Sequence, residues 1–209
     1  KSGVHTIEQN PNHWLSPVDG TIHSFGNIED GRFRQSKEKY GRVSELLGPH
    51  DNFLSPESYQ SGSYMIIYLS PKDYHRVHTH EGGILQKIRY MPGQLWPVFP
   101  AATRNIDSLF DRNERLVFEI KTAKQTTILS MIGAFGVGRM GSDFIDIITN
   151  QSGPQQDFEL QNRVERGTEL GYFALGSTVI LLWPNRDLQW KVQEGESIRM
   201  GKTIATRLD

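Results

Sequence analysis

The sequence predicts a mainly β protein of the α+β class, built as a single domain of antiparallel sheets with few short helices. Short segments rich in β-branched and aromatic residues recur along the chain, and such segments favour strands. The 209 residues include 20 glycines and 10 prolines, which provide many turns between short elements. Only two segments have a helical pattern, and the chain length fits one domain.

The strands are expected where apolar residues are continuous or alternate with polar ones. Residues 63–69 are apolar on both faces, which predicts a central strand that is buried on both sides. Residues 84–90 alternate between apolar and polar side chains, as a half-buried strand does. Further strands are expected from Thr21, at residues 115–120 and 126–135 with a turn near Ala123 between them, and at residues 179–183.

The remaining segments predict helices, a loop and a terminal hairpin. Residues 44–48 predict one helical turn that ends at its glycine, and residues 106–110 predict a second short helix. The tail is expected to form a hairpin from residues 192–198 and 201–205. Residues 151–157 are the most loop-like segment of the chain.

Composition and charge exclude several classes of protein. The 23 basic and 24 acidic residues give a net charge of −1, which argues against a general electrostatic surface for nucleic acid. The charged run at residues 112–115 is typical of a solvated face. The absence of cysteine excludes disulfides, thiolate metal sites and a cysteine nucleophile. No apolar run approaches the roughly 18 residues that a membrane-spanning helix needs.

Three histidines, His75, His78 and His80, lie within six residues. They are open to three interpretations: a metal site, a general acid or base, and a polar loop with solvated imidazoles. In an extended segment His78 and His80 share a face and His75 lies on the opposite one. That arrangement weakens a three-histidine site, and we expect no metal.

Ser177 follows a glycine and stands between two apolar runs, so it is a candidate nucleophile that needs a base. The alternative is an ordinary Ser-Thr turn that enters a strand. The glycines of residues 133–138 lack the order of a phosphate-binding loop, and we expect turn glycines there.

Several motifs follow one another along residues 16–183. They are Ser16-Pro17-Val18-Asp19-Gly20, Gln35-Ser36-Lys37, Tyr40, Glu45-Leu46-Leu47-Gly48, Tyr68-Leu69-Ser70-Pro71-Lys72-Asp73-Tyr74-His75-Arg76-Val77-His78, Tyr90-Met91-Pro92-Gly93, Asn113-Glu114-Arg115, Val137-Gly138, Gly167-Thr168-Glu169-Leu170-Gly171 and Leu175-Gly176-Ser177-Thr178-Val179. In this order and spacing they resemble the phosphatidylserine decarboxylases, a pyruvoyl-dependent family of self-processing proenzymes.

The resemblance implies that the Gly176–Ser177 bond is cleaved by the chain itself. Residues 1–209 would then be the catalytic domain, with residues 1–176 as β chain and residues 177–209 as α chain. The family's processing triad matches Asp19, His78 and Ser177. By this resemblance His78 takes the Ser177 proton, and Asp19 fixes the imidazole tautomer.

The resemblance also implies a covalent pyruvoyl cofactor derived from Ser177, which takes up the charge left when CO2 departs. His75, the first histidine of the Tyr-His-Arg string, then returns a proton to the substrate carbon. The expected reaction is the conversion of phosphatidylserine to phosphatidylethanolamine by a carboxy-lyase. Two alternatives are a pyruvoyl-dependent decarboxylase of a soluble amino acid, and a carrier or binding module without catalysis.

A phospholipid substrate implies a membrane surface as partner, and the expected location is peripheral, on the cytoplasmic face. The family's N-terminal membrane-associating segment is absent from this chain, which begins at Lys1. Leu95, Trp96 and Phe99 lie in a proline-bounded stretch and are candidates for membrane contact. The alternative is that they cap the core. A homodimer is expected, and nucleic acid is not a partner.

Two departures from the family pattern concern the site. Thr79-His80 stands where Met-Pro often follows the second histidine, and Glu38 stands where the family usually has glycine after Lys37. Near the ends of the chain, residues 17–22 and 195–204 resemble the two halves of a biotinyl- or lipoyl-type barrel-sandwich module. This likeness supports a barrel-sandwich-like element and is the basis of the carrier alternative.

Overall fold

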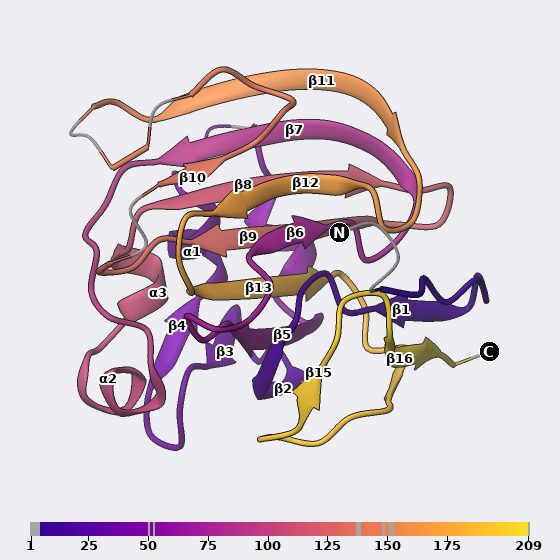
Figure 1. The fold of residues 1–209 in the computed structure, drawn as a ribbon, viewed down its shortest axis with the longest axis horizontal. Helices are drawn as coiled ribbons and strands as arrows, with labels where there is room; N and C mark the ends of the chain where they lie inside the picture. Colours follow the sequence, from indigo (N-terminus) through magenta and orange to yellow (C-terminus); the bar gives the residue numbers. More distant parts are fainter. Residues whose placement is uncertain are drawn as a thin grey trace.

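The computed structural model describes residues 5–49, 51, 53–136, 139–147, 149–150 and 153–208. Its main layer is an antiparallel sheet of eight strands, which Figure 1 shows as a broad twisted layer. In spatial order the strands are β11 (Gln156–Val164), β7 (Gly83–Met91), β8 (Arg115–Lys121), β9 (Thr126–Ile132), β13 (Thr178–Trp183), β5 (Ser63–Tyr68), β2 (Gly20–Asn27) and β15 (Ser197–Ile198). The mainly β prediction is confirmed.

The middle of this sheet is the apolar centre of the molecule. Every residue of β13 is buried, and β5 on one side and β9 on the other are nearly as enclosed. The prediction of a central strand at residues 63–69 is therefore confirmed. The strand predicted at residues 126–135 ends earlier, at Ile132, because Gly133 turns away to bond the Glu114 carbonyl and Gly136 takes a φ of +83°.

A second, smaller sheet covers part of the main one. It consists of β10 (Met140–Gly141), β12 (Glu169–Phe173) and β6 (Arg76–His78), with β12 in the middle. Figure 1 shows β12 and β6 in front of β8, β9 and β13. A side chain at Gly171 would stand 3.1 Å from the sulfur of Met131 in β9, so the two layers touch closely here. The second sheet carries His78, and the chain leaves β12 to reach Ser177.

The C-terminal segment does not form the predicted hairpin of residues 192–198 and 201–205. β15 pairs with β2, whereas β16 (Thr203–Arg207) pairs with β1 (His13–Leu15) and β14 (Leu188–Trp190) in a third sheet. The prediction was wrong because the two halves do not pair with each other: β16 lies between β1 and β14, and β15 pairs with β2. That pairing joins the two segments that resemble barrel-sandwich halves.

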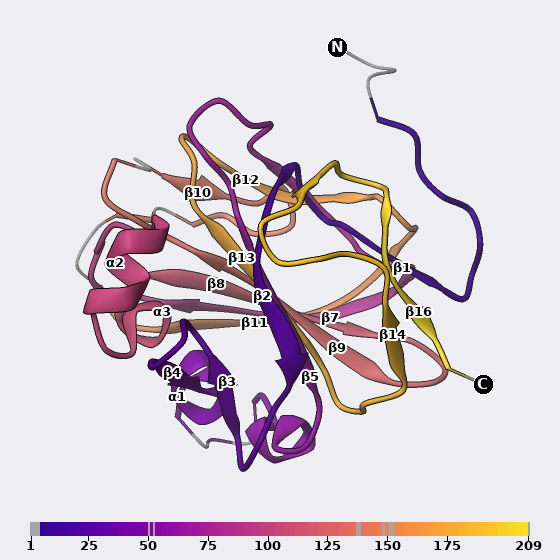
Figure 2. The ribbon, with the colours of Figure 1, turned by 90° about the horizontal axis from the view of Figure 1, so that it is seen from below.

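Short helices and a small two-stranded sheet close one end of the main sheet, and the third sheet closes the other (Figure 2). The bounds are α1 (Val43–Leu47), the 3₁₀ helix η1 (Pro56–Tyr59), α2 (Pro100–Asn105), α3 (Leu109–Arg112), β3 (Arg32–Arg34) and β4 (Tyr40–Arg42). Gly48 ends α1 with a φ of +92°, as expected. The helix predicted at residues 106–110 is displaced, because Ser108 adopts a left-handed conformation that separates α2 from α3.

The charged run at residues 112–115 is not a solvated face. Arg115 is buried and donates to the carbonyl oxygens of Leu46, Asn113 and Glu45, while the Tyr90 hydroxyl donates to the buried Glu114 carboxylate at 2.7 Å. The prediction failed because these charges fasten α1 to β8 inside the fold. Among the described residues, no helix is long and apolar enough to cross a membrane.

Candidate active site

The Gly176–Ser177 bond lies where the chain enters β13, against the segment that follows β5. Ser177 is fully buried; its carbonyl oxygen accepts from the Leu69 N–H at 2.7 Å, and its hydroxyl donates to the Ile132 carbonyl. A Cβ at Gly176 would stand 2.5 Å from the Leu69 carbonyl oxygen. Only glycine therefore fits before Ser177, and the peptide bond between them is held tightly against neighbouring backbone.

His75 contacts the same stretch of backbone. Its Nε2 lies 3.2 Å from the carbonyl oxygen of Ser70, and the missing Cβ of Gly176 would meet that same residue's carbonyl carbon at 2.7 Å. Asp73 steadies Ser70 by accepting from its N–H at 2.7 Å and from its hydroxyl at 2.8 Å. His75 is partly exposed, so a histidine accessible to solvent and the predicted cleavage bond share one contact residue.

His78 is buried at the end of β6 between two hydrogen-bond partners. Its Nδ1 lies 2.8 Å from the Gly167 carbonyl, which can only accept, so Nδ1 carries the proton. Its Nε2 is therefore the unprotonated nitrogen and accepts from the Tyr74 hydroxyl at 3.1 Å. Burial lowers the pKa of His78 below its ordinary value, partly offset by the Gly167 bond and by Glu169. The ring is neutral at pH 7, with its lone pair on Nε2.

Asp19 is linked to His78 indirectly. Oδ1 of Asp19 accepts from the Met200 N–H at 2.8 Å and from Nε2 of His5 at 2.8 Å. The His5 ring lies 4.8 Å from the Tyr74 ring, and Tyr74 stacks on His78. Asp19, His5, Tyr74 and His78 thus form one connected group. In this structure the Gly167 carbonyl fixes the His78 tautomer, the role that the resemblance implied for Asp19.

The predicted triad is only partly assembled. None of the hydrogen bonds between described residues joins Ser177 to His78. The Ser177 hydroxyl donates to the Ile132 carbonyl, and the two ring nitrogens of His78 bond Gly167 and Tyr74. Direct proton transfer between them requires the Ser177–Ile132 and Tyr74–His78 bonds to open.

The three histidines of residues 75–80 contact different groups. His80 is fully buried, with Nε2 3.0 Å from the Thr127 hydroxyl and its ring against Trp14 and Trp183. Within the part of the chain that the structure describes, no three His, Cys, Asp or Glu side chains are grouped as metal ligands. His80 therefore packs in the core, and the two candidate catalytic histidines are His75 and His78.

Several apolar side chains are exposed, and two of them, Phe135 and Leu175, lie close in the chain to Ile132 and Ser177, which are joined by a hydrogen bond. Trp96 and Phe99 are 41% and 47% exposed, which argues against the alternative that they cap the core; Leu95 is half-buried. Sequence reasoning missed Phe135 and Leu175, which are 81% and 40% exposed. Leu95 lies beside Gly133, and Leu175 lies beside Gly136. We call Leu95, Trp96, Phe99, Phe135 and Leu175 the apolar rim.

Sequence reasoning also missed His5 and Gly167 as site residues. Gly167 is 89 positions from His78, and His5 is 14 positions from Asp19, so spacing carried no signal for either contact. Tyr74 and Gly167 both stood within quoted family motifs, but nothing in the sequence indicated that either contacts His78. The Val137-Gly138 motif and residues 151–152 of the predicted loop lie outside the described residues.

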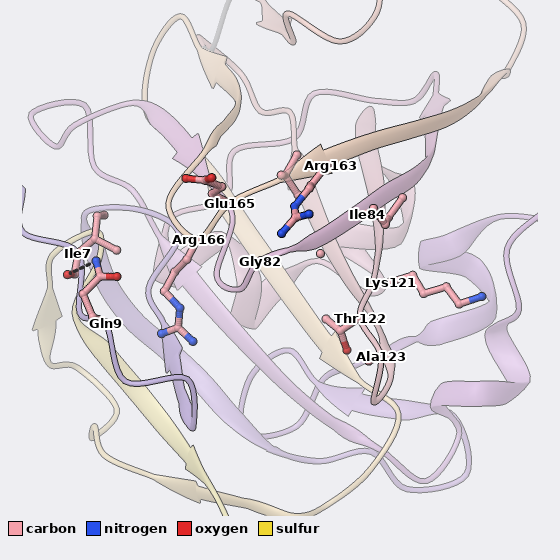
Figure 3. Close-up of a pocket in the computed structure, with 12 residues that line it drawn as sticks. Ile7, Gln9, Gly82, Ile84, Lys121, Thr122, Ala123, Arg163, Glu165 and Arg166 are labelled. Atoms are coloured by element: carbon pink, nitrogen blue, oxygen red, sulfur yellow. Dashed lines mark hydrogen bonds between the residues drawn. The ribbon is translucent and has the colours of Figure 1, made fainter.

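A surface pocket of about 770 Å³ lies apart from these groups (Figure 3). It is lined by the start of β7, the β8–β9 turn and the β11–β12 turn with Glu165 and Arg166. None of Asp19, His75, His78 and Ser177 lines it. The pocket matters here because its wall is the outer side of the turn whose Gly167 carbonyl holds His78.

Comparison with known proteins identifies the chain's relatives. A family model described as phosphatidylserine decarboxylase matches residues 1–206. The phosphatidylserine decarboxylase proenzyme of Brevibacillus brevis is 40% identical over 213 residues, which cover 99% of this chain and 75% of the relative. The proenzyme of Legionella pneumophila is 40% identical, and the match covers 91% of this chain and 69% of the relative. The proenzyme of Myxococcus xanthus is 36% identical, and the match covers 98% of this chain and 73% of the relative.

The protein is a carboxy-lyase, a class defined by these matches together with the fold and the Gly176–Ser177 bond beside its histidines. The chain belongs to the phosphatidylserine decarboxylase family.

Proposed function

We propose that this chain cleaves itself between Gly176 and Ser177 and then decarboxylates phosphatidylserine to phosphatidylethanolamine. The observation that carries the proposal is the placement of the Gly176–Ser177 bond: it is clamped against residues 69–71, and His75 contacts the same Ser70. The proenzyme names of the relatives agree with self-processing. Cleavage would leave residues 1–176 as β chain and 177–209 as α chain.

Cleavage begins with the Ser177 hydroxyl. Oγ forms a bond to the Gly176 carbonyl carbon, the C–N bond breaks, and the Oγ proton passes through Nε2 of His78 to the released nitrogen. Loss of the Ser177 Cα proton then breaks the Cβ–O bond and frees the Gly176 carboxylate. Hydrolysis of the remaining unsaturated residue releases ammonia and leaves a ketone at the new N-terminus.

The surroundings of Ser177 fit a pyruvoyl group at this position. The glycine before it leaves no side chain over the reacting carbonyl, and the buried Thr178 hydroxyl next to it has no hydrogen-bond partner among the described residues. The pyruvoyl ketone would accept the substrate amine and take up the electron pair left by CO2. Thr178 therefore supplies a spare polar group beside the ketone.

His75 is proposed to return the proton to the substrate carbon. It is partly exposed, and its Nε2 contact with Ser70 places it beside the residue that clamps Gly176. His78 is buried behind Tyr74 and serves the cleavage step instead. The two histidines thus act in different reactions.

The apolar rim is the proposed contact with the membrane. Leu175 is two residues from Ser177, and Phe135 and Trp96 are 81% and 41% exposed. The Arg112 guanidinium lies 5.9 Å from the centre of the Trp96 ring, and Arg104 and Arg139 are also exposed nearby in the chain. Trp favours the lipid interface and cations favour an anionic leaflet. A peripheral location on the cytoplasmic face and a homodimer are further proposals.

The substrate class is tested by release of CO2. Purified protein is given phosphatidylserine in mixed micelles, a short-chain soluble analogue, or free amino acids. The proposal predicts CO2 and phosphatidylethanolamine from the lipid and little or none from free amino acids. Turnover of a free amino acid without turnover of the lipid would instead establish the soluble-substrate enzyme.

A further inference from the structure

Thr79 joins the end of β6 to the turn between β11 and β12. Its side chain is buried, and its hydroxyl donates to the Glu165 carbonyl at 2.7 Å and accepts from the Thr168 N–H at 3.1 Å. Its own N–H donates to the Thr168 carbonyl at 2.8 Å, and its carbonyl accepts from Gly167 at 3.1 Å. One residue therefore bonds both ends of the turn.

The bond from Thr168 has a geometric consequence for His78. The Thr168 N–H and the Gly167 carbonyl belong to the same planar peptide unit and point in opposite directions. When the Thr79 hydroxyl holds the N–H, it also fixes the direction of the carbonyl, which accepts from Nδ1 of His78 at 2.8 Å. That acceptor is what leaves Nε2 of His78 unprotonated.

On its outer side the turn is supported by the N-terminal segment, where Ile7 packs against Gly167 and Arg166 donates to the Glu8 carbonyl at 3.4 Å. Gly167 has a φ of +78°, and Glu165 and Arg166 line the surface pocket of Figure 3. Bonds within the turn, from the Thr168 N–H to the Glu165 carbonyl and from the Glu165 N–H to the Thr168 hydroxyl, set its shape. They do not set its orientation toward His78, because they move with the turn.

We propose that Thr79 is a positioning residue for self-cleavage, whose hydroxyl orients the Gly167 carbonyl and thereby sets the His78 tautomer. The inference rests on the proposed self-cleavage with His78 as base. Methionine, which often occupies this position in the family motif, has no hydroxyl, so the hydroxyl anchor belongs to this chain's own sequence.

The first test reads the tautomer directly. The full chain carrying Ser177→Ala, which keeps it uncleaved, is labelled with ¹⁵N-histidine, and the His78 ring is observed by long-range ¹H–¹⁵N correlation NMR. We expect one tautomer, protonated at Nδ1. Adding Thr79→Val should give a mixture of tautomers, and Thr79→Ser should restore the single one. An unchanged single tautomer in Thr79→Val would overturn the proposal.

The second test measures cleavage of the full chain with Ser177 intact, synthesised cell-free and followed over time on gels. Thr79→Val is expected to cleave about tenfold more slowly, the lower end of the loss that follows removal of an outer hydrogen-bond partner of a metal-ligating histidine. Thr79→Ala is the second variant should valine fail to fold, and Thr79→Ser should recover the rate. Thr103→Val, a buried threonine in α2 that loses one hydroxyl–carbonyl bond, is the control and should cleave normally.

The outcomes separate the inference from the function on which it rests. A chain with Thr79 intact that never cleaves contradicts the proposed function itself. Normal cleavage together with equal rates in Thr79→Val and Thr79→Ser contradicts only the role of Thr79.

Discussion

Nε2 of His5 lies 2.8 Å from Oδ1 of Asp19, and through this bond the N-terminal segment closes over the start of β2. The same carboxylate oxygen accepts from the Met200 N–H, so Asp19 holds two chain segments beside Tyr74 and His78. The connected group of Asp19, His5, Tyr74 and His78 therefore has the negative charge of Asp19 at one end and the proposed base, His78, at the other.

The first prediction concerns that charge. Asp19→Asn keeps the shape and an acceptor for Met200 but removes the charge that orients the histidine group, and we expect cleavage to slow by about 10²-fold or more. Gel analysis of the fragments over time gives the rate. Asp187→Asn, at a carboxylate paired with Arg207, is the matched control and should cleave normally. Cleavage of Asp19→Asn at the unmodified rate would remove Asp19 from the mechanism.

The second prediction separates the two histidines. His75→Ala should still cleave, because its contacts are with Ser70 and not with the His78 group. The processed variant should then lose about 10²–10⁴-fold in CO2 release, the usual contribution of a general acid or base. Mass spectrometry reports processing, and trapped CO2 reports turnover. If the variant cleaves and turns over normally, the role given to His75 is incorrect.

The third prediction is a pH dependence of cleavage. Burial lowers the folded-state pKa of His78 below its ordinary 6.5, and a base must be neutral to act. The rate should therefore stay level between about pH 8 and 6.5 and fall only as pH drops through the lowered pKa. Precursor kept cold after cell-free synthesis is transferred to buffers between about pH 5 and 8, and cleavage is followed.

The direction of this effect is tested with Glu169→Gln. The Glu169 carboxylate raises the His78 pKa and offsets part of the lowering by burial, so its removal should move the acid limb of the profile to lower pH. Arg76, left without its Glu169 partner, acts in the same direction. A limb that moves to higher pH would show that His78 is not the titrating base.

The fourth prediction concerns the apolar rim. Trp96→Ala and Phe135→Ser should each weaken binding to vesicles that contain phosphatidylserine by about tenfold, because burial of such a side chain contributes roughly 1.5–3 kcal/mol. Activity on a short-chain soluble analogue should change little. Leu208→Ser, an exposed apolar residue near the C-terminus, is the control for a general loss of apolar surface. Equal losses on vesicles and on the analogue would mean that these residues support the core.

Elements that depend on a local sequence pattern could be predicted, whereas pairings between strands far apart in the sequence could not. Strands with a local apolar pattern, such as residues 63–69 and 84–90, were expected and are present as β5 and β7. The C-terminal hairpin prediction failed because β15 pairs with β2, more than 170 positions away, and β16 lies between the similarly distant β1 and the nearby β14. Local alternation cannot show which distant strand will supply the hydrogen bonds.

The candidate site was predictable only in its chemically marked residues. Ser177, His75 and His78 stood in motifs as reactive side chains, whereas Gly167 stood in a motif without any sign that its backbone carbonyl would set the His78 tautomer. Phe135 was hidden in a glycine-rich run whose exposure depends on the early end of β9 at Ile132. Each missed contact depends on tertiary packing rather than on residue type.

The intact mass of the purified protein tests the central claim most directly. The account predicts two fragments, residues 1–176 and 177–209, the smaller one lacking a free N-terminal amine because Ser177 has become a pyruvoyl group. Ser177→Ala should remain one chain of residues 1–209. A protein with Ser177 that keeps its full-length mass indefinitely would contradict the account.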